Sequence, residues 1–172
     1  MNKDLIIRSI LAGFFSAVTI GVLTVLTYET GGIFLIASFG STMVLLYGHP
    51  ESPFAQPKNI FFGHLLTATV GIACLHIIPF PEYFLIHIFS YSFEISKLVY
   101  TIPFAVGLGV GLMILLNVTH PPAGGNPIIV VVGSVSLDYI ISPIILGSII
   151  ILIFGTILNR FILRKNYPSK WI

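Results

Sequence analysis

The stretch HPPAGGNP, residues 120–127, decides how this chain has to be arranged. Its prolines lack a backbone N–H and push the preceding residues out of the helical region, and its two glycines leave the backbone unconstrained. We therefore predict that this stretch is not helical. It lies between the almost wholly apolar segments 108–118 and 128–135. Irregular backbone at membrane depth has to be buried in protein or line a cavity, because bare peptide groups cannot face lipid.

The composition is that of a membrane protein. Of the 172 residues, 56% are hydrophobic and 8% are charged, and the mean hydropathy is +1.02. A soluble domain carries about 25% charged residues. Nothing in the sequence resembles a nucleic-acid-binding module or a soluble catalytic domain. The single cysteine, Cys74, stands in an apolar run and is interpreted as a small core residue.

Hydropathy along the chain predicts an all-α polytopic membrane protein with about five full or near-full transmembrane helices and one short half-helix. The half-helix is residues 128–137, after the HPPAGGNP loop. The second apolar run, residues 33–47, is short for a full span and is interrupted by the stretch SFGST, residues 38–42. Residues 82–97 are expected at the membrane interface and residues 159–172 in a cytoplasmic basic tail of a single domain, 1–172. The five longer helices are predicted at residues 5–27, 33–47, 60–78, 98–118 and 139–158.

Lysine and arginine are distributed unevenly between the two sides of this arrangement, seven against one. Since cytoplasmic loops carry the excess of basic residues, both termini are expected in the cytoplasm, which needs an even number of crossings. If residues 128–137 re-enter rather than cross, the parity stays open. The basic residues assigned to the cytoplasmic side are Lys3, Arg8, Lys58, Arg160, Arg164, Lys165 and Lys170, and Lys97 stands on the other side.

The HPPAGGNP stretch has a counterpart earlier in the chain. Residues 49–57, HPESPFAQP, also begin with His-Pro, end with an amide residue before proline, and follow an apolar helix. Two proline-broken elements in the two halves are typical of a duplicated transporter. Chance similarity of loop chemistry explains the same pattern, and both explanations stay open.

Asn126 and Pro127 predict the start of a helix, because asparagine is a favoured N-cap and proline a favoured first residue. The free N–H groups of that helix would then face the loop, where Gly124 and Gly125 let a small anion approach closely. The other interpretation is a well-capped helix that binds nothing. Pro121 and Pro122 belong to the same candidate site.

Three residues of the second helix, Gly40, Ser41 and Thr42, are candidates for an opposite wall, since hydroxyl groups donate hydrogen bonds to anions; small residues that only pack helices are the alternative. His120 and His64 are candidates for proton or anion binding, or else buried packing residues. No histidine pair has the spacing of metal ligands and no cysteine joins them, so we expect no metal and no cofactor.

Gln56 precedes the third helix as Asn126 precedes the short one, and Lys58 at the same mouth would attract anions or simply mark the cytoplasmic side. Small residues at helical spacing, 13/17/21 and 107/111, favour tight helix packing within one chain or between copies. A protomer this small encloses little protein around a pathway, so we expect a homo-oligomer in the lipid bilayer.

On three stretches the chain resembles the HPP family of integral membrane proteins, which is named for its His-Pro-Pro tripeptide. The stretches are residues 120–127, residues 39–46 (FGSTMVLL), and residues 52–59 (SPFAQPKN) followed by Gly63-His64. The resemblance covers residues 10–158, and Gly125 departs from it where the family often has alanine. It implies a multi-pass protein of a prokaryotic cytoplasmic membrane. Plant chloroplast and cyanobacterial members are associated with nitrite transport, so nitrite comes to this chain by analogy.

The expected function is therefore transport of a small inorganic anion, nitrite first and nitrate, formate or chloride equally compatible, and not catalysis. One alternative is a neutral-solute or water pore, in which Asn126-Pro127 and Gln56-Pro57 pair as in aquaporins; Ile128 departs from that motif. Another is a membrane enzyme using His120 or His64, for which no partner group is evident. A third is a ligand-sensing subunit without flux. The expected site comprises His120, Pro121, Pro122, Gly124, Gly125, Asn126, Gly40, Ser41, Thr42, His64 and Gln56.

Overall fold

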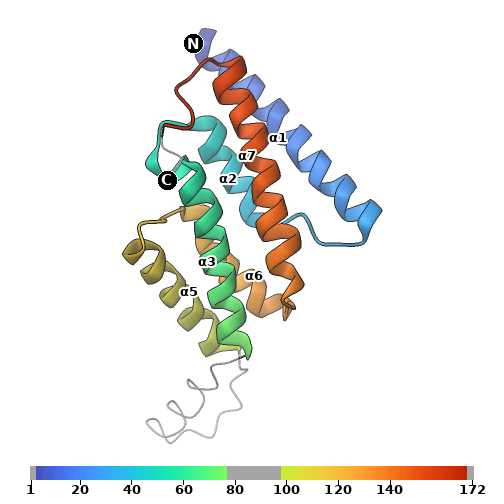
Figure 1. Ribbon diagram of the computed structural model, residues 1–172, viewed down its shortest axis with the longest axis vertical. Coiled ribbons are helices and arrows are strands. Elements are labelled where there is room, and N and C mark those ends of the chain that lie inside the picture. Colours follow the sequence, from blue (N-terminus) through green and yellow to red (C-terminus); the bar gives the residue numbers. More distant parts are fainter. Residues whose placement is uncertain (1–2, 77–97, 170–172) are drawn as a thin grey trace, which may run out of the picture.

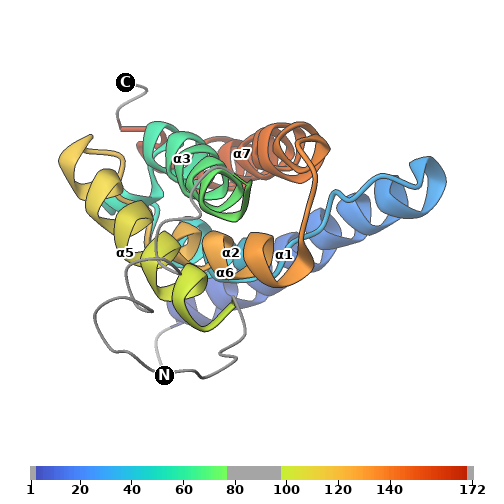
Figure 2. The same cartoon turned by 90° about the horizontal axis from the view of Figure 1, so that it is seen from below.

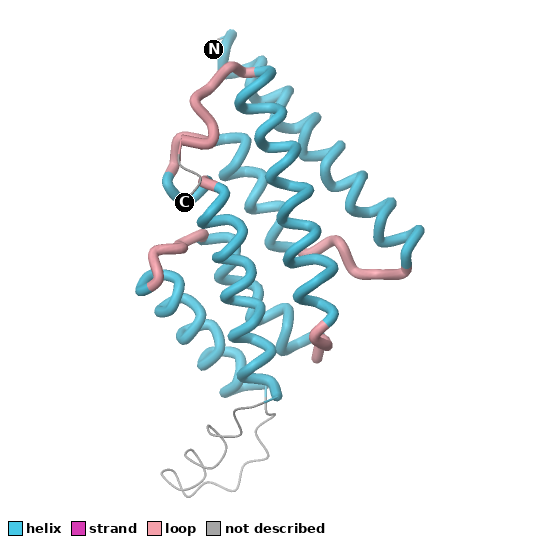
Figure 3. The backbone as a smooth tube through the Cα atoms, viewed as in Figure 1, coloured by secondary structure: helices cyan, strands magenta, loops and turns pink. Residues whose placement is uncertain are grey.

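Two short helices that begin inside the bundle distinguish this fold. The computed structural model describes residues 3–76 and 98–169, and all regular structure within them is helical (Figure 3). The short helices are α2 (Ala37–Gly48) and α6 (Asn126–Gly133). The others are α1 (Lys3–Thr30), α3 (Pro57–His76), α5 (Leu98–Leu115) and α7 (Ser148–Thr156), which π-helical turns η3 (Ile140–Gly147) and η4 (Ile157–Ile162) extend at both ends.

The element lengths confirm a polytopic helical membrane protein. Within residues 3–76 and 98–169, three helices are long and apolar enough to cross a bilayer: α1, α3 and the continuous helix Ile140–Ile162. Helix α5 is a shorter apolar helix, and α2 and α6 have only 12 and 8 residues. The second predicted span is therefore also a short helix, and the segment 82–97 predicted at the interface lies outside the described residues. The last helix continues beyond residue 158 to Ile162.

The interruption of the second apolar run does not break its helix. Helix α2 begins at Ala37 and runs unbroken through residues 38–42, after an extended Ile36 with φ −132° and ψ 149°. A hydroxyl group in this stretch does not break the helix, because it can bond to a carbonyl of the same helix: Ser41 Oγ donates to the carbonyl of Ser38 at 2.9 Å. The break comes before the hydroxyl residues, in the chain that leads into α2.

The prediction that HPPAGGNP is not helical is wrong. Residues Pro121–Gly125 form a 3₁₀ helix, η2, which continues directly into α6. Its prolines stand in the first turn, where a missing N–H costs nothing because no carbonyl precedes it to accept a bond. The turn is closed by a hydrogen bond from the N–H of Ala123 to the carbonyl of His120, at 2.9 Å.

The two halves of the described chain run in opposite directions (Figure 1). Helix α1 leads away from the end where the N-terminus lies, α2 returns from the middle toward that end, and α3 leads away again. In the second half, α5 approaches that end, α6 leads away from the middle, and α7 approaches once more. Helix α3 packs against α5 and α6 as α7 packs against α1 and α2, and α3 and α7 also touch. This is the arrangement of an inverted repeat.

Glycine pairs support the same correspondence. An added Cβ at Gly63 of α3 would lie 2.8 Å from the Cβ of His120, just before η2, and one at Gly71 would lie 3.0 Å from the Cα of Pro127 in α6. Gly147 and Gly155 face α2 in the same way, the first at 2.6 Å from Phe39 and the second against Leu46. In each half, two glycines two helical turns apart let a long helix approach the short helix or the segment that leads into it. The small-residue stripes, predicted to pack helices within one chain or between copies, have no neighbour among the described residues of one chain at positions 13, 21, 107 and 111.

The outer surface is apolar, as lipid requires. Helix α1 lies at one flank and α5 at the other, with α3 and α7 between them (Figure 2). Large hydrophobic side chains on α1, such as Ile10 and Phe14, are more than half exposed. Cys74 is buried in a small apolar cluster, which confirms its assignment as a core residue.

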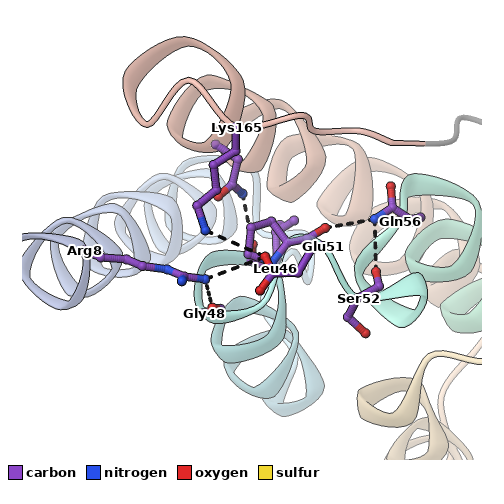
Figure 4. A network of polar contacts seen from close by, with 9 residues as sticks. Arg8, Leu46, Gly48, Glu51, Ser52, Gln56 and Lys165 are labelled. Carbon is purple, nitrogen blue, oxygen red and sulfur yellow. Dashed lines mark hydrogen bonds and ion pairs between the residues drawn. The ribbon is translucent and has the colours of Figure 1, made fainter. Parts of the chain in front are cut away.

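Both termini lie toward the same end, where a polar network ties three segments together (Figure 4). Glu51, in the loop after α2, pairs with Arg8 of α1 at 3.9 Å and with Lys165 of the tail at 3.7 Å. The Arg8 guanidinium also donates to the carbonyl of Gly48. The pKa of Glu51 is lowered, first by a hydrogen bond from its own backbone N–H and then by the two basic side chains. The loop over the bundle is thus held by both ends of the chain.

Candidate functional site

Six polar side chains form a buried cluster where α2 and α6 begin. Helix α2 contributes two hydroxyl groups, α3 contributes a histidine and a hydroxyl group, and the segment that leads into η2 and α6 contributes a histidine and an amide. Buried polar groups are costly unless they are hydrogen-bonded, and here each of them is. The six, which we call the polar cluster, are Ser38, Thr42, His64, Thr67, His120 and Asn126, all at most 6% exposed.

Asn126 is the centre of the polar cluster rather than a helix cap. It has helical φ and ψ of −59° and −41°, and the N-cap of α6 is Gly125, without a side-chain cap. The Asn126 Oδ1 accepts from Ser38 Oγ at 2.8 Å, and its Nδ2 donates to His64 Nδ1 at 3.0 Å and to Thr67 Oγ1 at 3.1 Å. Its amide therefore joins α2, α3 and α6, and the expectation that it caps the helix is wrong.

The orientation of the Asn126 amide follows from its neighbours. Its Nδ2 lies 3.3 Å from the carbonyl oxygen of His64, which can only accept. Turning the amide would place two acceptor oxygens against each other. Because Nδ2 also donates to His64 Nδ1, this ring nitrogen carries no proton, and the proton of neutral His64 is on Nε2.

Thr42 joins the two histidines. Its Oγ1 lies 3.0 Å from His64 Nε2 and 2.9 Å from His120 Nε2, and the ring centroids are 5.0 Å apart. His120 Nδ1 lies 2.8 Å from the carbonyl oxygen of Phe54. That carbonyl can only accept, so neutral His120 carries its proton on Nδ1 and accepts at Nε2. The hydrogen bonds then all point one way, from Asn126 through His64, Thr42 and His120 to Phe54.

The α3 backbone makes this contact between the histidines possible. Gly63 precedes His64, and the Cβ of His120 occupies the space that a side chain at residue 63 would need. The carbonyl of Val118 closes the same space, 3.0 Å from the position of an added Cβ. The Gly63-His64 pair therefore places the His64 ring beside His120.

Several predicted site residues lie away from the polar cluster. Gly40 and Ser41 are exposed on the other side of α2, so only Thr42 of that wall faces inward. Gln56 is buried in the loop. Its amide Nε2 donates to the carbonyls of Pro50 and Ser52, and its Oε1 accepts from the N–H of Ser169. The pairing of Gln56 with Asn126 is not present; Asn126 bonds instead to Ser38, His64 and Thr67 of the first half.

The predicted anion cradle at Gly124 and Gly125 is not formed as expected. These residues belong to η2, and the N–H of Asn126 already donates to the carbonyl of Ala123. Pro121 is exposed and Pro122 half-buried. A 3₁₀ turn that runs into α6 uses the donors that an isolated helix start would leave free.

Sequence reasoning missed Ser38, Thr67 and the carbonyl of Phe54 as members of the site. Thr67 stands one turn after His64, at the i, i+3 spacing that puts two residues on one helix face, and this was the available signal. Ser38 stands four residues before Thr42, again on one face. Neither spacing says which face turns inward.

A cavity of about 590 Å³ lies just beyond Phe54, at the end of the molecule that holds the termini. Phe54 lines it and also accepts the hydrogen bond from His120, so the cavity and the polar cluster share one residue. Asn59 donates to the carbonyl of Thr119 at 2.8 Å, which joins the start of α3 to the segment before η2. The polar residues that line the cavity are Glu51, Gln56, Lys58, Asn59, Asn117, Thr119 and Ser169.

Among the described residues, no three His, Cys, Asp or Glu side chains are grouped closely enough to hold a metal ion. The two histidines of the polar cluster face a hydroxyl group and no carboxylate. The chemistry available in the polar cluster is therefore hydrogen bonding and proton binding by neutral groups.

Fold and site together define a polytopic helical membrane protein in which two short helices, pointing in opposite directions, begin at a shared polar cluster. Within this class the chain belongs to the HPP family, since the family model described as "HPP, transmembrane region" matches residues 1–168. This confirms the resemblance that the three sequence stretches carry.

Two relatives from Dictyostelium discoideum, both described only as transmembrane proteins, are each 32% identical to this chain. The matches cover 80% and 84% of this chain but 45% and 44% of the relatives, so the chain spans less than half of their length. No solved structure shows a significant match.

Proposed function

We propose that this protein carries a small inorganic anion across the membrane, with nitrite as the first candidate and nitrate, formate and chloride as competitors. One observation supports the proposal above the others: α2 and α6 enter from opposite sides, and the buried polar cluster lies where they begin. In transporters, broken helices of this kind supply the substrate site near the middle of the membrane.

The polar cluster offers hydrogen-bond donors without fixed charge. The hydroxyl groups of Ser38, Thr42 and Thr67 and the amide of Asn126 can each donate to a planar anion such as nitrite. In the structure these groups bond to one another, so a bound anion has to replace protein acceptors with its own oxygens. That exchange favours a ligand with two or more acceptor atoms, because each protein donor then keeps a partner.

The cavity beyond Phe54 is the proposed entrance. Lys58 lines it and would raise the local concentration of anions. Glu51 lines it as well, but its charge is balanced by Arg8 and Lys165. By the distribution of basic residues, this entrance and both termini face the cytoplasm. A prokaryotic cytoplasmic membrane is proposed from the family resemblance; the two relatives come from a eukaryote.

A neutral-solute or water pore is the second candidate. Two short helices that begin at one point from opposite sides favour it, because that arrangement brings the positive ends of their dipoles to the same place and opposes cation passage. Ser38 and Asn126 would be its central pair, in place of Gln56 and Asn126. Swelling of vesicles in an osmotic gradient, independent of any anion, distinguishes this candidate from the first.

The test of anion transport uses two serines of the same helix. Purified protein in vesicles is assayed for nitrite uptake, with nitrate, formate and chloride as competitors and protein-free vesicles as the baseline. Ser38→Ala removes the buried donor to Asn126, whereas Ser41→Ala removes an exposed hydroxyl that bonds only to its own helix. We expect Ser38→Ala to lower uptake about fivefold or more, as for the loss of one hydrogen bond of about 1 kcal/mol, and Ser41→Ala to leave it unchanged.

Equal uptake by both variants would remove the polar cluster from the pathway. No saturable uptake of any of the four anions by correctly inserted protein would overturn the transport proposal. In that case anion binding without flux would support the ligand-sensing alternative.

An assembly of several copies is also proposed, because the exposed small residues at positions 13, 21, 107 and 111 leave room for a neighbouring helix.

A further inference from the structure

The bridge between the two histidines has room for one additional proton. Thr42 Oγ1 has three polar neighbours: His64 Nε2 at 3.0 Å, His120 Nε2 at 2.9 Å, and the carbonyl oxygen of Ser38 at 3.0 Å. A hydroxyl group donates one hydrogen bond and accepts two. In the neutral cluster Thr42 accepts from His64 and donates its one proton to His120. It therefore does not donate to the carbonyl of Ser38.

Adding a proton to His120 Nε2 requires only that the Thr42 O–H turn. Both histidines then donate to Thr42 Oγ1 through Nε2–H, and the Thr42 proton points to the carbonyl of Ser38. His120 Nδ1–H still donates to Phe54. Every hydrogen bond in the bridge is kept without displacement of a heavy atom, so the same geometry accommodates the neutral and the singly protonated pair.

The bridge cannot hold a second proton in the same way. After the first protonation, the one ring nitrogen without a proton is His64 Nδ1, which accepts from Asn126 Nδ2. A proton there would face the N–H of the amide, and the interaction would become repulsive. The capacity of the pair is therefore one proton.

The protonated pair would lack a counter-ion among the described residues. The groups that face the two rings are Ser38, Thr42 and Phe39 of α2, Gly63 and Thr67 of α3, Asn126 of α6, the carbonyl of Phe54 in the 3₁₀ turn Pro53–Ala55, and the Val118 carbonyl after α5. None of them is charged, and apart from the two histidines none titrates. Glu51 and Lys58 line the cavity on the other side of Phe54. A charge buried this deeply is stable only with a partner of opposite sign.

We propose that the His64–Thr42–His120 bridge binds one proton together with one anion, and that the protein carries the two in the same direction. This rests on the proposed transport function and names its coupling ion. The bound monoanion supplies the missing counter-ion, and the proton on His120 stabilises the anion among donors that are otherwise neutral. Proton and anion enter and leave as a pair, so one cycle moves no net charge.

The first experiment tests proton binding without requiring transport. Protein with ¹⁵N-labelled histidine is examined by NMR in lipid at neutral pH, before and after addition of nitrite, nitrate or chloride. We expect neutral His120 with its proton on Nδ1 in the absence of anion, and a doubly protonated His120 ring in its presence. Thr42→Val, which keeps the shape but removes the hydroxyl, should abolish this change, and Thr42→Ser should retain it. A His120 ring that stays neutral with bound anion would overturn the proposal.

The second experiment measures coupling. Nitrite uptake into vesicles is compared with and without an outside that is one pH unit more acidic, a driving force of about 1.4 kcal/mol or about a tenfold accumulation for one proton per anion. Protein-free vesicles correct for nitrous acid that crosses lipid unaided, and a pH-sensitive dye inside reports the proton. The acceleration by the gradient should be present in the wild type and Thr42→Ser and lost in Thr42→Val.

The outcomes separate this inference from the proposed function. Saturable uptake that does not respond to the gradient would overturn proton coupling and leave anion transport standing. Protonation of His120 on anion binding, with no uptake of any anion, would support the proton site and overturn transport in favour of sensing.

Discussion

At the scale of single residues, the polar cluster shows how fixed acceptors determine proton positions. Two backbone carbonyls, those of His64 and Phe54, can only accept, and they fix the amide of Asn126 and the tautomers of both histidines. The tautomers of both imidazole rings are thus determined by uncharged hydrogen-bonding partners. In the proposed mechanism, anion binding and proton binding both depend on Thr42, whose hydroxyl group lies between the two rings.

Glu51 provides a prediction about pH at this scale. Its pKa is lowered in the folded protein, so its contribution to stability is present above the pKa of the unfolded chain and is lost as pH falls through the lowered value. Its side chain is 67% exposed, so solvent screening keeps each ion pair at about 1 kcal/mol or less. We expect Glu51→Gln to lower stability slightly at neutral pH, by about 1 kcal/mol at most, and to have no effect in acid.

The measurement is thermal unfolding in detergent across the acidic range, with low and high salt compared. Because the pairs with Arg8 and Lys165 are electrostatic, added salt should shrink the difference between wild type and variant. A difference that persists at a pH where the carboxyl is protonated would show that Glu51 acts through packing instead.

At the scale of elements, glycines on the long helices position the short ones. Gly63 admits the segment before η2 to the surface of α3 and Gly71 admits α6, and Gly147 and Gly155 admit α2 to the surface of the last helix. Each short helix buries its polar start only because a long helix lacks side chains there. The packing of elements and the assembly of the polar cluster are therefore the same event.

Gly63→Ala tests this dependence. The new methyl group would meet the Cβ of His120 at 2.8 Å and the carbonyl oxygen of Val118 at 3.0 Å, and neither is the free end of a flexible side chain. We expect a loss of about 1–3 kcal/mol in the free energy of unfolding, and lower anion uptake because the two histidines move apart. Unfolding by a denaturing detergent measures the first effect.

Gly40→Ala is the matched control, since Gly40 is also inside a helix but has nothing within 4 Å of an added Cβ. Alanine there should be neutral or slightly stabilising. A Gly40→Ala variant as damaged as Gly63→Ala would mean that the added methyl group acts on the helix itself and not on the contact with His120.

At the scale of the whole molecule, the opposed halves make the site two-sided. The polar cluster receives Ser38 and Thr42 from one half and Asn126 and His120 from the other. The two long helices that pack against the short ones are not equivalent: polar Thr67 lies between the two glycines of α3, whereas apolar Ile151 lies between Gly147 and Gly155. The arrangement of the helices is nearly symmetric, but of these two long helices only α3 contributes polar side chains to the cluster.

Single-cysteine labelling tests this topology. Cys74 is buried, so a Cys74→Ala background is expected to fold and to leave no other thiol. Cysteine at Ser169, in the tail, and at Ser136, between α6 and the last helix, should react with membrane-impermeant reagents from opposite sides of the membrane. Both serines are exposed. Labelling from the same side would contradict the arrangement of the halves.

Much of this protein follows from the sequence by itself. Scarcity of charge and the length of the apolar runs determine a helical membrane protein, because only helices satisfy their own backbone in lipid. Three motifs in order identify the HPP family, and they contain His64, His120 and Asn126. The positions of α1, α3, α5 and the last helix were predicted to within a few residues.

Only the tertiary structure decided which side chains meet. Helices such as α2 and α3 carry apolar residues on every face. Hydrophobic periodicity therefore does not tell which face turns inward, and Ser41 and Thr42 looked equivalent in sequence. Asn126 bonds to Ser38, 88 positions away, and no local rule reaches that far. The close approach of α6 to α3 depends on the absence of a side chain at Gly71, which acquires meaning only when another helix occupies the space.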